Sequence, residues 1–167
     1  MEEIAAEAGV SKPTLYATFR NKDAALGGAI RFAKRAQLLA VQKEWGRAGK
    51  LSKKLDVFFD QLVLAGFDML HNSPDAAAFE TAVGESSEEA IESTRAAEIE
   101  AVRGLFERSE RLAEYNLDPQ RYASFFVDSA MNAKRLTRSR SELERHLETL
   151  KAATVVLLEP EPSVSKA

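Results

Sequence analysis

The sequence predicts an all-α protein. Apolar residues recur at helical spacing along almost all of the 167 residues, and Gly or Pro stands mainly where one helix must end and another begin. The chain has no cysteine, which excludes disulfides, thiolate metal sites and cysteine nucleophiles. With 45% hydrophobic and 29% charged residues, the composition is that of a globular protein with a buried core.

The first helices are short. One is predicted over about 2–8, ending at Gly9, because glycine tolerates the left-handed conformation that closes a helix. Ser11 then offers an N-cap hydroxyl for a second helix, and Pro13 stands in its first turn, where a missing N–H costs nothing. Asn21 or Asp23 caps a long third helix, which is expected over about 24–48.

Five further helical segments are predicted. Their approximate ranges are 52–71, 76–83, 86–115, 120–137 and 139–158. Residues 72–75 form a turn before the second of these, Ser86 or Ser87 starts the third, and the run Asn116–Pro119 precedes the fourth. The last begins with capping-box spacing, either Ser139 with Glu142 or Ser141 with Glu144.

Charge is distributed unevenly along the chain. Residues 1–54 hold eleven Lys or Arg against five Asp or Glu, whereas residues 55–167 hold twelve against twenty-one. A basic head on an acidic body suits a protein that touches a polyanion with one end. The alternative is that Lys34, Arg35, Lys43 and Arg47 only solvate a long helix.

Residues 3–16 describe a short helix, a turn of about three residues that contains Gly9, and a second helix that opens with small or polar side chains. This is helix-turn-helix architecture, in which the second helix enters the major groove of DNA. Lys12, Pro13, Thr14 and Ala17 are suited to base edges and thymine methyl groups. Ser11, Tyr16, Thr18 and Lys22 are placed to hold phosphates.

The pattern Ile4-Ala5-x-x-Ala8-Gly9-Val10-Ser11-x-x-Thr14-Leu15-Tyr16-x-x-Phe19-x-x-Lys22-Asp23-x-x-Leu26 resembles the N-terminal DNA-binding signature of the TetR family. The resemblance implies that Lys12, Pro13, Thr14, Tyr16 and Ala17 belong to the recognition helix and that Lys22 contacts the phosphate backbone. It also implies a helical regulatory domain whose last two long helices form a four-helix bundle with a partner subunit. The partners expected are therefore a double-stranded DNA operator, a small-molecule effector and a second copy of the chain.

Members of the family normally carry another helix before this motif, whereas this sequence begins directly on the first motif helix. Without that helix, Ile4, Ala8, Leu15 and Phe19 lose part of their apolar cover. We therefore expect this polypeptide to bind DNA weakly or not at all. The alternative function that follows is a helical small-molecule-binding dimer without DNA binding.

Three regions are predicted. A helix-turn-helix domain occupies 1–35, a helical ligand-binding and dimerisation domain occupies 36–160, and a flexible tail occupies 161–167. The first boundary falls inside the long third helix, which would act as a lever between the two domains. The function predicted is a ligand-responsive transcriptional regulator, a repressor released by a small molecule.

The body is rich in aromatic residues, which favours an apolar cavity between helices. Four polar residues beside apolar faces, Gln61, Asp68, His71 and Asn132, are candidates for orienting a ligand. The apolar and aromatic candidates for lining the cavity are Trp45, Phe58, Leu62, Phe79 and Phe125. For each residue separately, the alternative is an ordinary place in the core.

Two apolar faces near the C-terminus are predicted to form the homodimer. Small residues on the first face permit close helix approach, and leucine spacing on the second suits bundle packing. The predicted interface residues are Phe126, Ala130, Ala133, Leu143, Leu147, Leu150, Thr154 and Leu157. The alternative, that these faces serve the subunit's own core, explains the first helix better than the second.

Enzymatic activity is not expected. His71 and His146 lie on different helices, no metal-binding spacing or Gly-rich phosphate loop occurs, and paired glutamates such as Glu88-Glu89 are typical of solvated helix faces. We expect no cofactor and no metal. No apolar run is long enough for a membrane helix and no secretion signal opens the chain, so a cytoplasmic protein is predicted.

Overall fold

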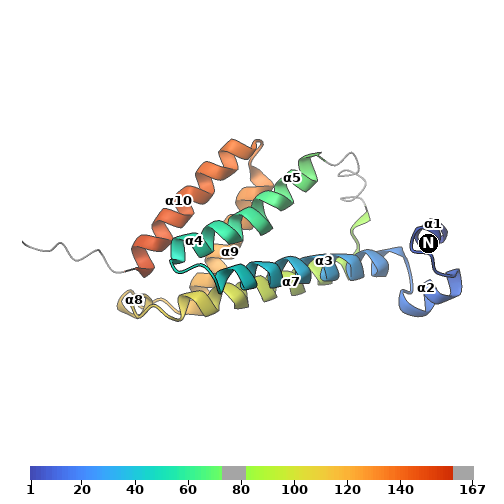
Figure 1. Cartoon of the computed structure of the whole chain (residues 1–167), viewed down its shortest axis with the longest axis horizontal. Coiled ribbons are helices and arrows are strands. Elements are labelled where there is room, and N and C mark those ends of the chain that lie inside the picture. The colour runs from blue at the N-terminus through green and yellow to red at the C-terminus, as the bar shows by residue number, and fades with distance from the viewer. Residues whose placement is uncertain (73–81, 160–167) are drawn as a thin grey trace, which may run out of the picture. The chain divides into compact units, whose positions relative to one another are not determined.

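A computed structural model describes residues 1–72 and 82–159 (Figure 1). Within these ranges the chain is helical and contains no strand, which confirms the all-α prediction. The helices are α1 (Glu2–Glu7), α2 (Lys12–Thr18), α3 (Lys22–Trp45), α4 (Leu51–Phe58), the π-helical turn η1 (Phe59–Leu64), α5 (Ala65–Asn72), α7 (Glu85–Phe106), α8 (Arg111–Glu114), α9 (Pro119–Leu136) and α10 (Arg140–Leu158). None of the helices in these ranges has the length and apolar character that a membrane crossing requires.

The chain divides into two compact units. The described residues of Met1–Ala36 and Pro74–Thr94 form the N-terminal unit, and those of Gln37–Ser73 and Arg95–Ala167 form the body. Helices α3 and α7 each begin in the N-terminal unit and end in the body. The predicted short segment at 76–83, apart from its last two residues, and the predicted tail at 161–167 lie outside the described residues.

In the N-terminal unit, local caps define the helices. Helix α1 ends in a Schellman motif: Gly9 has φ +64°, its N–H donates to the Ala6 carbonyl at 3.1 Å, and the Val10 N–H donates to the Ala5 carbonyl at 3.0 Å. Ser11 caps α2 as predicted. Of the two caps predicted for α3, Asn21 is the one used, since its Oδ1 accepts from the Ala24 N–H at 2.8 Å.

The start of α7 corrects a sequence prediction. Ser86 and Ser87 do not cap this helix, which already begins at Glu85. Their backbone N–H groups instead donate to the carboxylate of Asp23 on α3, at 2.8 Å and 3.1 Å. A side chain distant in sequence thus replaces the local cap that the pattern predicted.

The body is built around an aromatic centre. Phe126 of α9 lies 5.8 Å from Phe58, 5.5 Å from Phe59 and 5.5 Å from Phe106, measured between ring centroids. Phe58, Phe106 and Phe126 are fully buried. The run from α4 through η1 to α5 supplies one side of this core, and the end of α3, α7, α8, α9 and α10 supply the rest. Burial of this apolar surface is the main source of stability in the body.

Helix α7 ends at Phe106, whereas the sequence pattern predicted a continuation to about Tyr115. The reason is a contact with the C-terminus of α10. The Ser109 hydroxyl donates to the Leu158 carbonyl at 2.7 Å, and Arg111 Nη1 donates to the Glu159 carbonyl at 2.7 Å. Satisfying these free carbonyls favours a turn and the separate helix α8 over a longer α7.

The last two long helices begin where the sequence predicted. Asp118 caps α9 by accepting from the Arg121 N–H at 2.9 Å. Ser139 caps α10 by accepting from the Glu142 N–H at 3.3 Å, and Glu142 accepts in return from the Arg138 N–H at 3.1 Å. Of the two predicted pairs, Ser139 with Glu142 is therefore the one used, although Glu142 accepts from the residue before the N-cap instead of from the N-cap itself.

Candidate nucleic-acid interface

Helix α2 has a solvent-exposed polar surface and buries a single side chain, Leu15. All residues predicted to contact DNA are exposed: Ser11, Lys12, Pro13, Thr14, Tyr16, Ala17, Thr18 and Lys22. Seven of them belong to α2 or to its N-cap, and Lys22 is the first residue of α3. They therefore lie on the accessible surface of α2 and at the start of α3.

Ser11 orders the first turn of α2. Its Oγ accepts from the Thr14 N–H at 3.2 Å and lies 2.7 Å from the Thr14 hydroxyl. The same side chain thus caps the helix and fixes the orientation of the Thr14 hydroxyl. A fixed orientation is what a side chain needs if it is to distinguish one base edge from another.

Lys12 is held by α1. Its ammonium forms an ion pair with the carboxylate of Glu2, and both side chains remain largely exposed. The hydrogen bond and the charge of Lys12 lower the pKa of Glu2, and the same bond raises the pKa of Lys12. Exposed ion pairs are weak. The ammonium can therefore exchange Glu2 for a phosphate or a guanine at little cost.

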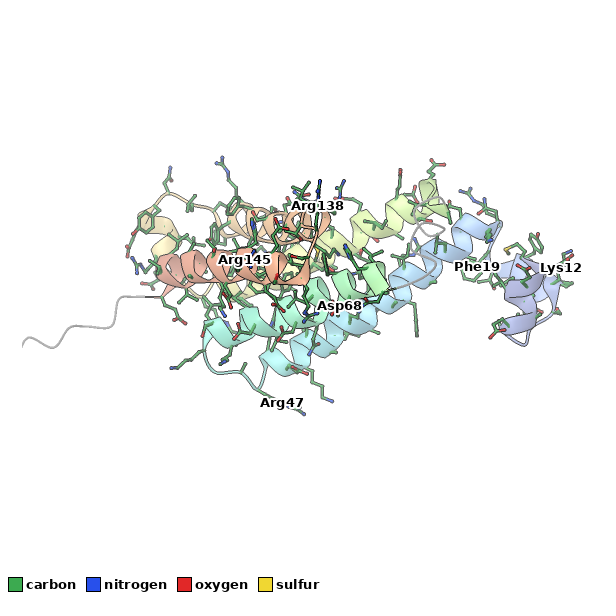
Figure 2. All side chains as sticks on the ribbon, turned by 90° about the horizontal axis from the view of Figure 1, so that it is seen from above. Lys12, Phe19, Arg47, Asp68, Arg138 and Arg145 are labelled. Atoms are coloured by element: carbon green, nitrogen blue, oxygen red, sulfur yellow. The ribbon has the colours of Figure 1, made fainter. Side chains whose placement is uncertain are left out.

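The far end of α2 is fixed against α3 through Phe19. A Cβ placed on Gly28 would lie 2.6 Å from Cε1 of Phe19, so this ring lies directly against the backbone of α3. Figure 2 shows Lys12 on the outer part of the α1–α2 hairpin and Phe19 where the chain passes into α3. Lys12 is thus available to a ligand, whereas Phe19 is half-buried and structural.

Asp23, one residue beyond Lys22, has a different role from its neighbour. The Ser87 hydroxyl, together with the Ser86 and Ser87 amides, lowers the pKa of Asp23 to about 2 despite the opposing effect of burial. Hydrogen bonds to a carboxylate stabilise its ionised form. Asp23 is therefore a structural acceptor within the unit.

An open apolar groove of about 770 Å³ borders this region. Its apolar lining consists of Ile4, Ala25, Leu26, Ala29 and Ala82, and Lys22 and Asp23 lie at its margin. Ile4 is half-buried and Ala8 is exposed, whereas Leu15 is buried. The apolar face predicted for the two motif helices is thus only partly covered.

The geometry agrees with the comparison to known families. Residues 1–26 match the family described as bacterial regulatory proteins, tetR family. The N-terminal segment is thus similar to that of tetR family regulatory proteins. The matched segment comprises α1, the turn at Gly9, α2 and the first residues of α3, and therefore contains the whole helix-turn-helix. No curated protein and no solved structure matches the chain.

In the body, the predicted effector residues occupy different environments. Trp45, Phe58 and Leu62 are buried, Gln61 and Asp68 are half-buried, His71, Phe125 and Asn132 are exposed, and Phe79 lies outside the described residues. The Trp45 Nε1 donates to the Lys54 carbonyl at 2.7 Å, and its ring stacks on Phe58 with centroids 6.5 Å apart. The buried members therefore fill the core among themselves.

The polar candidates also have partners. Asp68 forms an ion pair with Arg140 of α10. His71 Nδ1 donates to the Phe67 carbonyl at 2.9 Å, and the two rings stack with centroids 3.7 Å apart. These contacts are made at the end of α5, away from Trp45 on α3, so the structure does not bring the predicted effector residues into one cluster.

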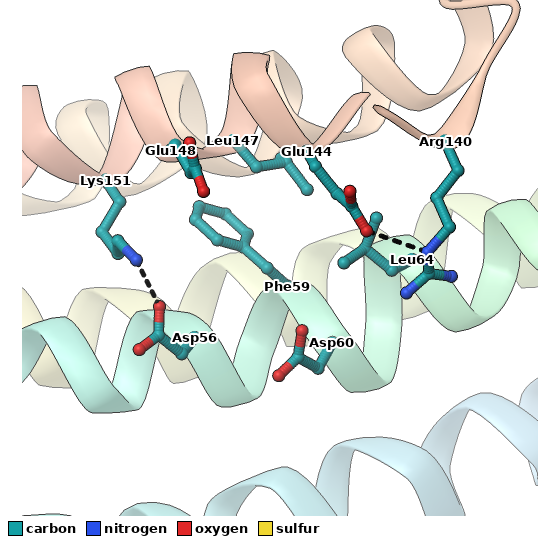
Figure 3. A pocket seen from close by; sticks show the side chains of 9 residues that line it. All are labelled: Asp56, Phe59, Asp60, Leu64, Arg140, Glu144, Leu147, Glu148 and Lys151. Atoms are coloured by element: carbon teal, nitrogen blue, oxygen red, sulfur yellow. Dashed lines mark hydrogen bonds and ion pairs between the residues drawn. The ribbon is translucent and has the colours of Figure 1, made fainter. Parts of the chain in front are cut away.

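Figure 3 shows a hollow on the body between α4–η1 and α10, with a volume of about 240 Å³. Its charged lining comprises Asp56, Asp60, Glu144, Glu148, Arg140 and Lys151. Lys151 is 2.6 Å from Asp56, and Arg140 is 2.9 Å from Glu144. This hollow is polar and smaller than most small-molecule sites, unlike the apolar cavity that the sequence predicted.

The predicted dimer residues are largely internal. Phe126, Ala130, Ala133, Leu143, Leu147 and Thr154 are buried in the core of their own chain, whereas Leu150 and Leu157 are half-buried. The Thr154 hydroxyl lies 3.1 Å from the hydroxyl of Tyr122, and burial raises the pKa of that tyrosine. The six buried side chains are closed to a second copy, which corrects their assignment as interface residues.

Sequence reasoning missed two polar features. Arg95 of α7 binds Asp128 of α9 through two hydrogen bonds of 2.7 Å, and Glu98 lies buried one turn further along α7. The other feature is the set of bonds between Asp23 and the start of α7. Both join residues far apart in sequence, so neither leaves a local pattern.

Proposed function

We propose that this protein is a ligand-responsive repressor. It binds an operator as a homodimer, and a small molecule bound in the body releases it from DNA. The observation that supports DNA reading most directly is the exposed surface of α2, on which the Thr14 hydroxyl lies 2.7 Å from the Ser11 hydroxyl and is oriented by it. The excess of Lys and Arg over Asp and Glu in residues 1–54 gives this end of the chain a positive charge, which attracts a polyanion such as DNA.

Individual roles follow from side-chain chemistry. Lys12, Pro13 and Thr14 contact base edges, because they stand early on the helix that enters the major groove. Ala17, one turn after Pro13, contributes apolar contact with a thymine methyl group. Ser11, Tyr16, Thr18 and Lys22 contact phosphates and set the register. To take part, Lys12 must leave Glu2, to which it is bound in the structure.

A pair of variants separates these roles. Thr14→Ala should cost about 1–3 kcal/mol of binding free energy at one base position and relax specificity there. Lys22→Ala should weaken binding to every sequence evenly and lower the salt slope by about 1. Equal losses for both variants on all sequences would contradict the assignment.

Homodimerisation is proposed through the outer faces of α9 and α10. Large apolar side chains remain exposed there: Phe125 is 57%, Leu136 80% and Val156 71% exposed. Exposed apolar side chains on one element mark interaction surfaces when they are contiguous. A two-fold dimer would place two recognition helices about 34–36 Å apart, one helical turn of DNA.

The dimer is tested by light scattering coupled to size-exclusion chromatography. Val156→Arg should convert the dimer to a monomer, since it places a charge in the proposed apolar contact. Met69→Arg is the matched control, because Met69 is 63% exposed on α5 of the same unit and should leave the dimer intact. A wild-type chain that is monomeric at micromolar concentration would refute the dimer.

The effector is proposed to be an apolar small molecule, which would have to displace aromatic and aliphatic side chains that fill the core in the structure. A panel of apolar compounds is screened for those that raise the melting temperature, which binding to the native state must do. Such compounds should also weaken operator binding. A compound that stabilises the body without changing operator affinity would argue against effector control.

The deciding measurement for the whole proposal is fluorescence anisotropy with the DNA upstream of the gene and with a randomised duplex pool, at two salt concentrations. If the proposal holds, the chain binds the upstream DNA more tightly than the pool and in a salt-sensitive way, although the partly covered motif helices make this binding weak. Absence of binding by the folded chain would instead support the alternative function, a helical small-molecule-binding dimer without DNA binding. Repression is then read from a reporter placed behind that DNA, whose expression should fall when the regulator is present.

A further inference from the structure

A set of hydrogen bonds in the N-terminal unit joins α3 to α7. The carboxylate of Asp23 accepts from the N–H groups of Gly84 at 3.1 Å, Ser86 at 2.8 Å and Ser87 at 3.1 Å, and it also binds the Ser87 hydroxyl. These partners lie 61 to 64 residues away in sequence. One side chain thus satisfies several of the free N–H groups at the start of α7.

The backbones also approach closely at this point. A Cβ on Gly27 would lie 2.6 Å from the carbonyl oxygen of Ser86, a separation that real side chains do not reach. Ser87 is fully buried. Asp23 and Gly27 on α3, with Gly84, Ser86 and Ser87, form what we call the Asp23 clamp. It is a packed junction, unlike the exposed ion pair of Lys12.

The clamp occupies the part of α3 that also fixes the recognition helix. Phe19, the C-cap of α2, lies against Gly28, the residue next to Gly27. In addition, Arg20 donates to the Ser86 hydroxyl at 3.4 Å. The first turns of α3 therefore hold the end of α2 and the start of α7 together.

Helix α7 continues without a break from the clamp to Phe106. Its last turns belong to the body, where Ile99, Val102 and Phe106 are buried in the core. Helix α7 therefore belongs to both units. Within the N-terminal unit, its start is bonded to the same turns of α3 that hold the end of α2.

We propose that Asp23 is a positioning residue that couples α7 to the recognition helix, so that α7 is a path by which the state of the body changes operator binding. This inference rests on the proposed DNA-binding function. It assigns Asp23 no contact with DNA. Because coupling between two sites is reciprocal, binding of DNA to α2 must in turn change the stability of α7.

The test uses the full chain and a duplex recovered from it by in vitro selection. Hydrogen exchange is followed in the α7 segment 95–106, with and without the duplex. In the wild type, DNA should slow exchange there by about fivefold or more, the lower end of measured coupling. In Asp23→Ala the slowing should be lost, although the variant still binds the duplex.

Two further variants keep the test specific. Ser87→Ala removes the hydroxyl partner of Asp23 from the other helix and should reduce the slowing partially. Asp118→Ala removes a comparable side-chain cap, 2.9 Å from the Arg121 N–H at the start of α9 in the body, and should leave the slowing unchanged. If Asp118→Ala abolished it as Asp23→Ala does, a general loss of stability would explain the result and overturn the proposal.

Failure of the clamp and failure of the function are distinguishable. If the wild type selects no duplex, the proposed function fails and this inference fails with it. If the wild type binds DNA and the slowing in α7 persists in Asp23→Ala, only the clamp proposal is overturned. Loss of the slowing in Asp23→Ala, with DNA binding retained and the Asp118→Ala control unaffected, supports it.

Discussion

The two units of the molecule are stabilised by different means. In the body, some twenty apolar side chains form one continuous core around Phe58, Phe106 and Phe126. In the N-terminal unit, the buried side chains outside glycine are Ala5, Leu15, Ala90 and Ser87 in the described residues. In this unit, polar caps and the Asp23 clamp hold the helices together, a role that apolar burial has in the body.

This difference indicates where each unit is sensitive. A core with many contacts loses stability mainly through the removal of large apolar groups. A unit held by a few directional contacts loses its geometry when a side chain is added where two backbones meet, when a special backbone conformation is disturbed, or when a charge is removed. The single tryptophan, Trp45, is in the body. Its fluorescence therefore reports on that unit separately.

The largest effect is expected from Phe126→Ala in the body. Truncating a fully buried ring that contacts three other rings should cost about 3–5 kcal/mol of unfolding free energy. Urea denaturation followed by Trp45 fluorescence measures it. Phe125→Ala, one residue earlier and 57% exposed, is the matched control and should cost far less. Equal losses would show that the core is not centred on Phe126.

A smaller effect is expected from Gly27→Ala in the N-terminal unit. Alanine ordinarily stabilises a helix interior relative to glycine, but here the added Cβ would lie 2.6 Å from the Ser86 carbonyl oxygen. Overpacking of this kind costs about 1–3 kcal/mol. Gly104→Ala in α7 has open space and should stabilise by about 0.5–1 kcal/mol. Stabilisation by Gly27→Ala, measured by thermal unfolding, would contradict the close approach.

Gly9→Ala should have a smaller effect still. The residue has φ +64° and no atom within 4 Å of an added Cβ, so the cost is backbone strain alone, about 1–2 kcal/mol. Amide exchange in α1 and α2 locates the loss in the N-terminal unit. Gly49→Ala also has open space but lacks the left-handed conformation, and should be almost neutral.

The last prediction concerns acid. Asp23 has a pKa of about 2 in the folded protein against an ordinary value of 3.8. Its contribution to stability is therefore fully present above about pH 4 and is lost as the pH falls toward 2. The amide resonances of Ser86 and Ser87 should titrate over this range, and Asp23→Asn should abolish that titration. Titration near 4 would indicate that the clamp is open in solution.

Features encoded locally were predictable from the sequence. The helix-turn-helix, the cap of α2 by Ser11 and the cap of α9 by Asp118 each depend on residues within a few positions of one another. The exposure of α2 follows from the same pattern, because one buried leucine leaves the other side chains outside. For these elements, the local segment contains all the groups that determine its structure.

Features that join distant segments were not predictable in this way. Asp23 is a residue type that often caps its own helix, but here its hydrogen-bond partners are at the start of α7. The apolar pattern of α9 and α10 identifies which residues are buried without stating what buries them, so Phe126 and Leu143 were assigned to a partner when they serve their own core. Likewise, nothing in residues 107–115 shows that the end of α10 interrupts α7.

The π-helical turn at Phe59–Leu64 has a consequence for chain length. Such a turn accommodates one residue more than a regular α-helix needs between the same two ends. A homologue with one residue fewer here, for example without the exposed Asp60, could close the turn into regular helix and keep both flanks facing the core. The same deletion inside α10 would rotate every later side chain by about 100°. Single-residue gaps among natural homologues should therefore be tolerated at this turn and absent from α10.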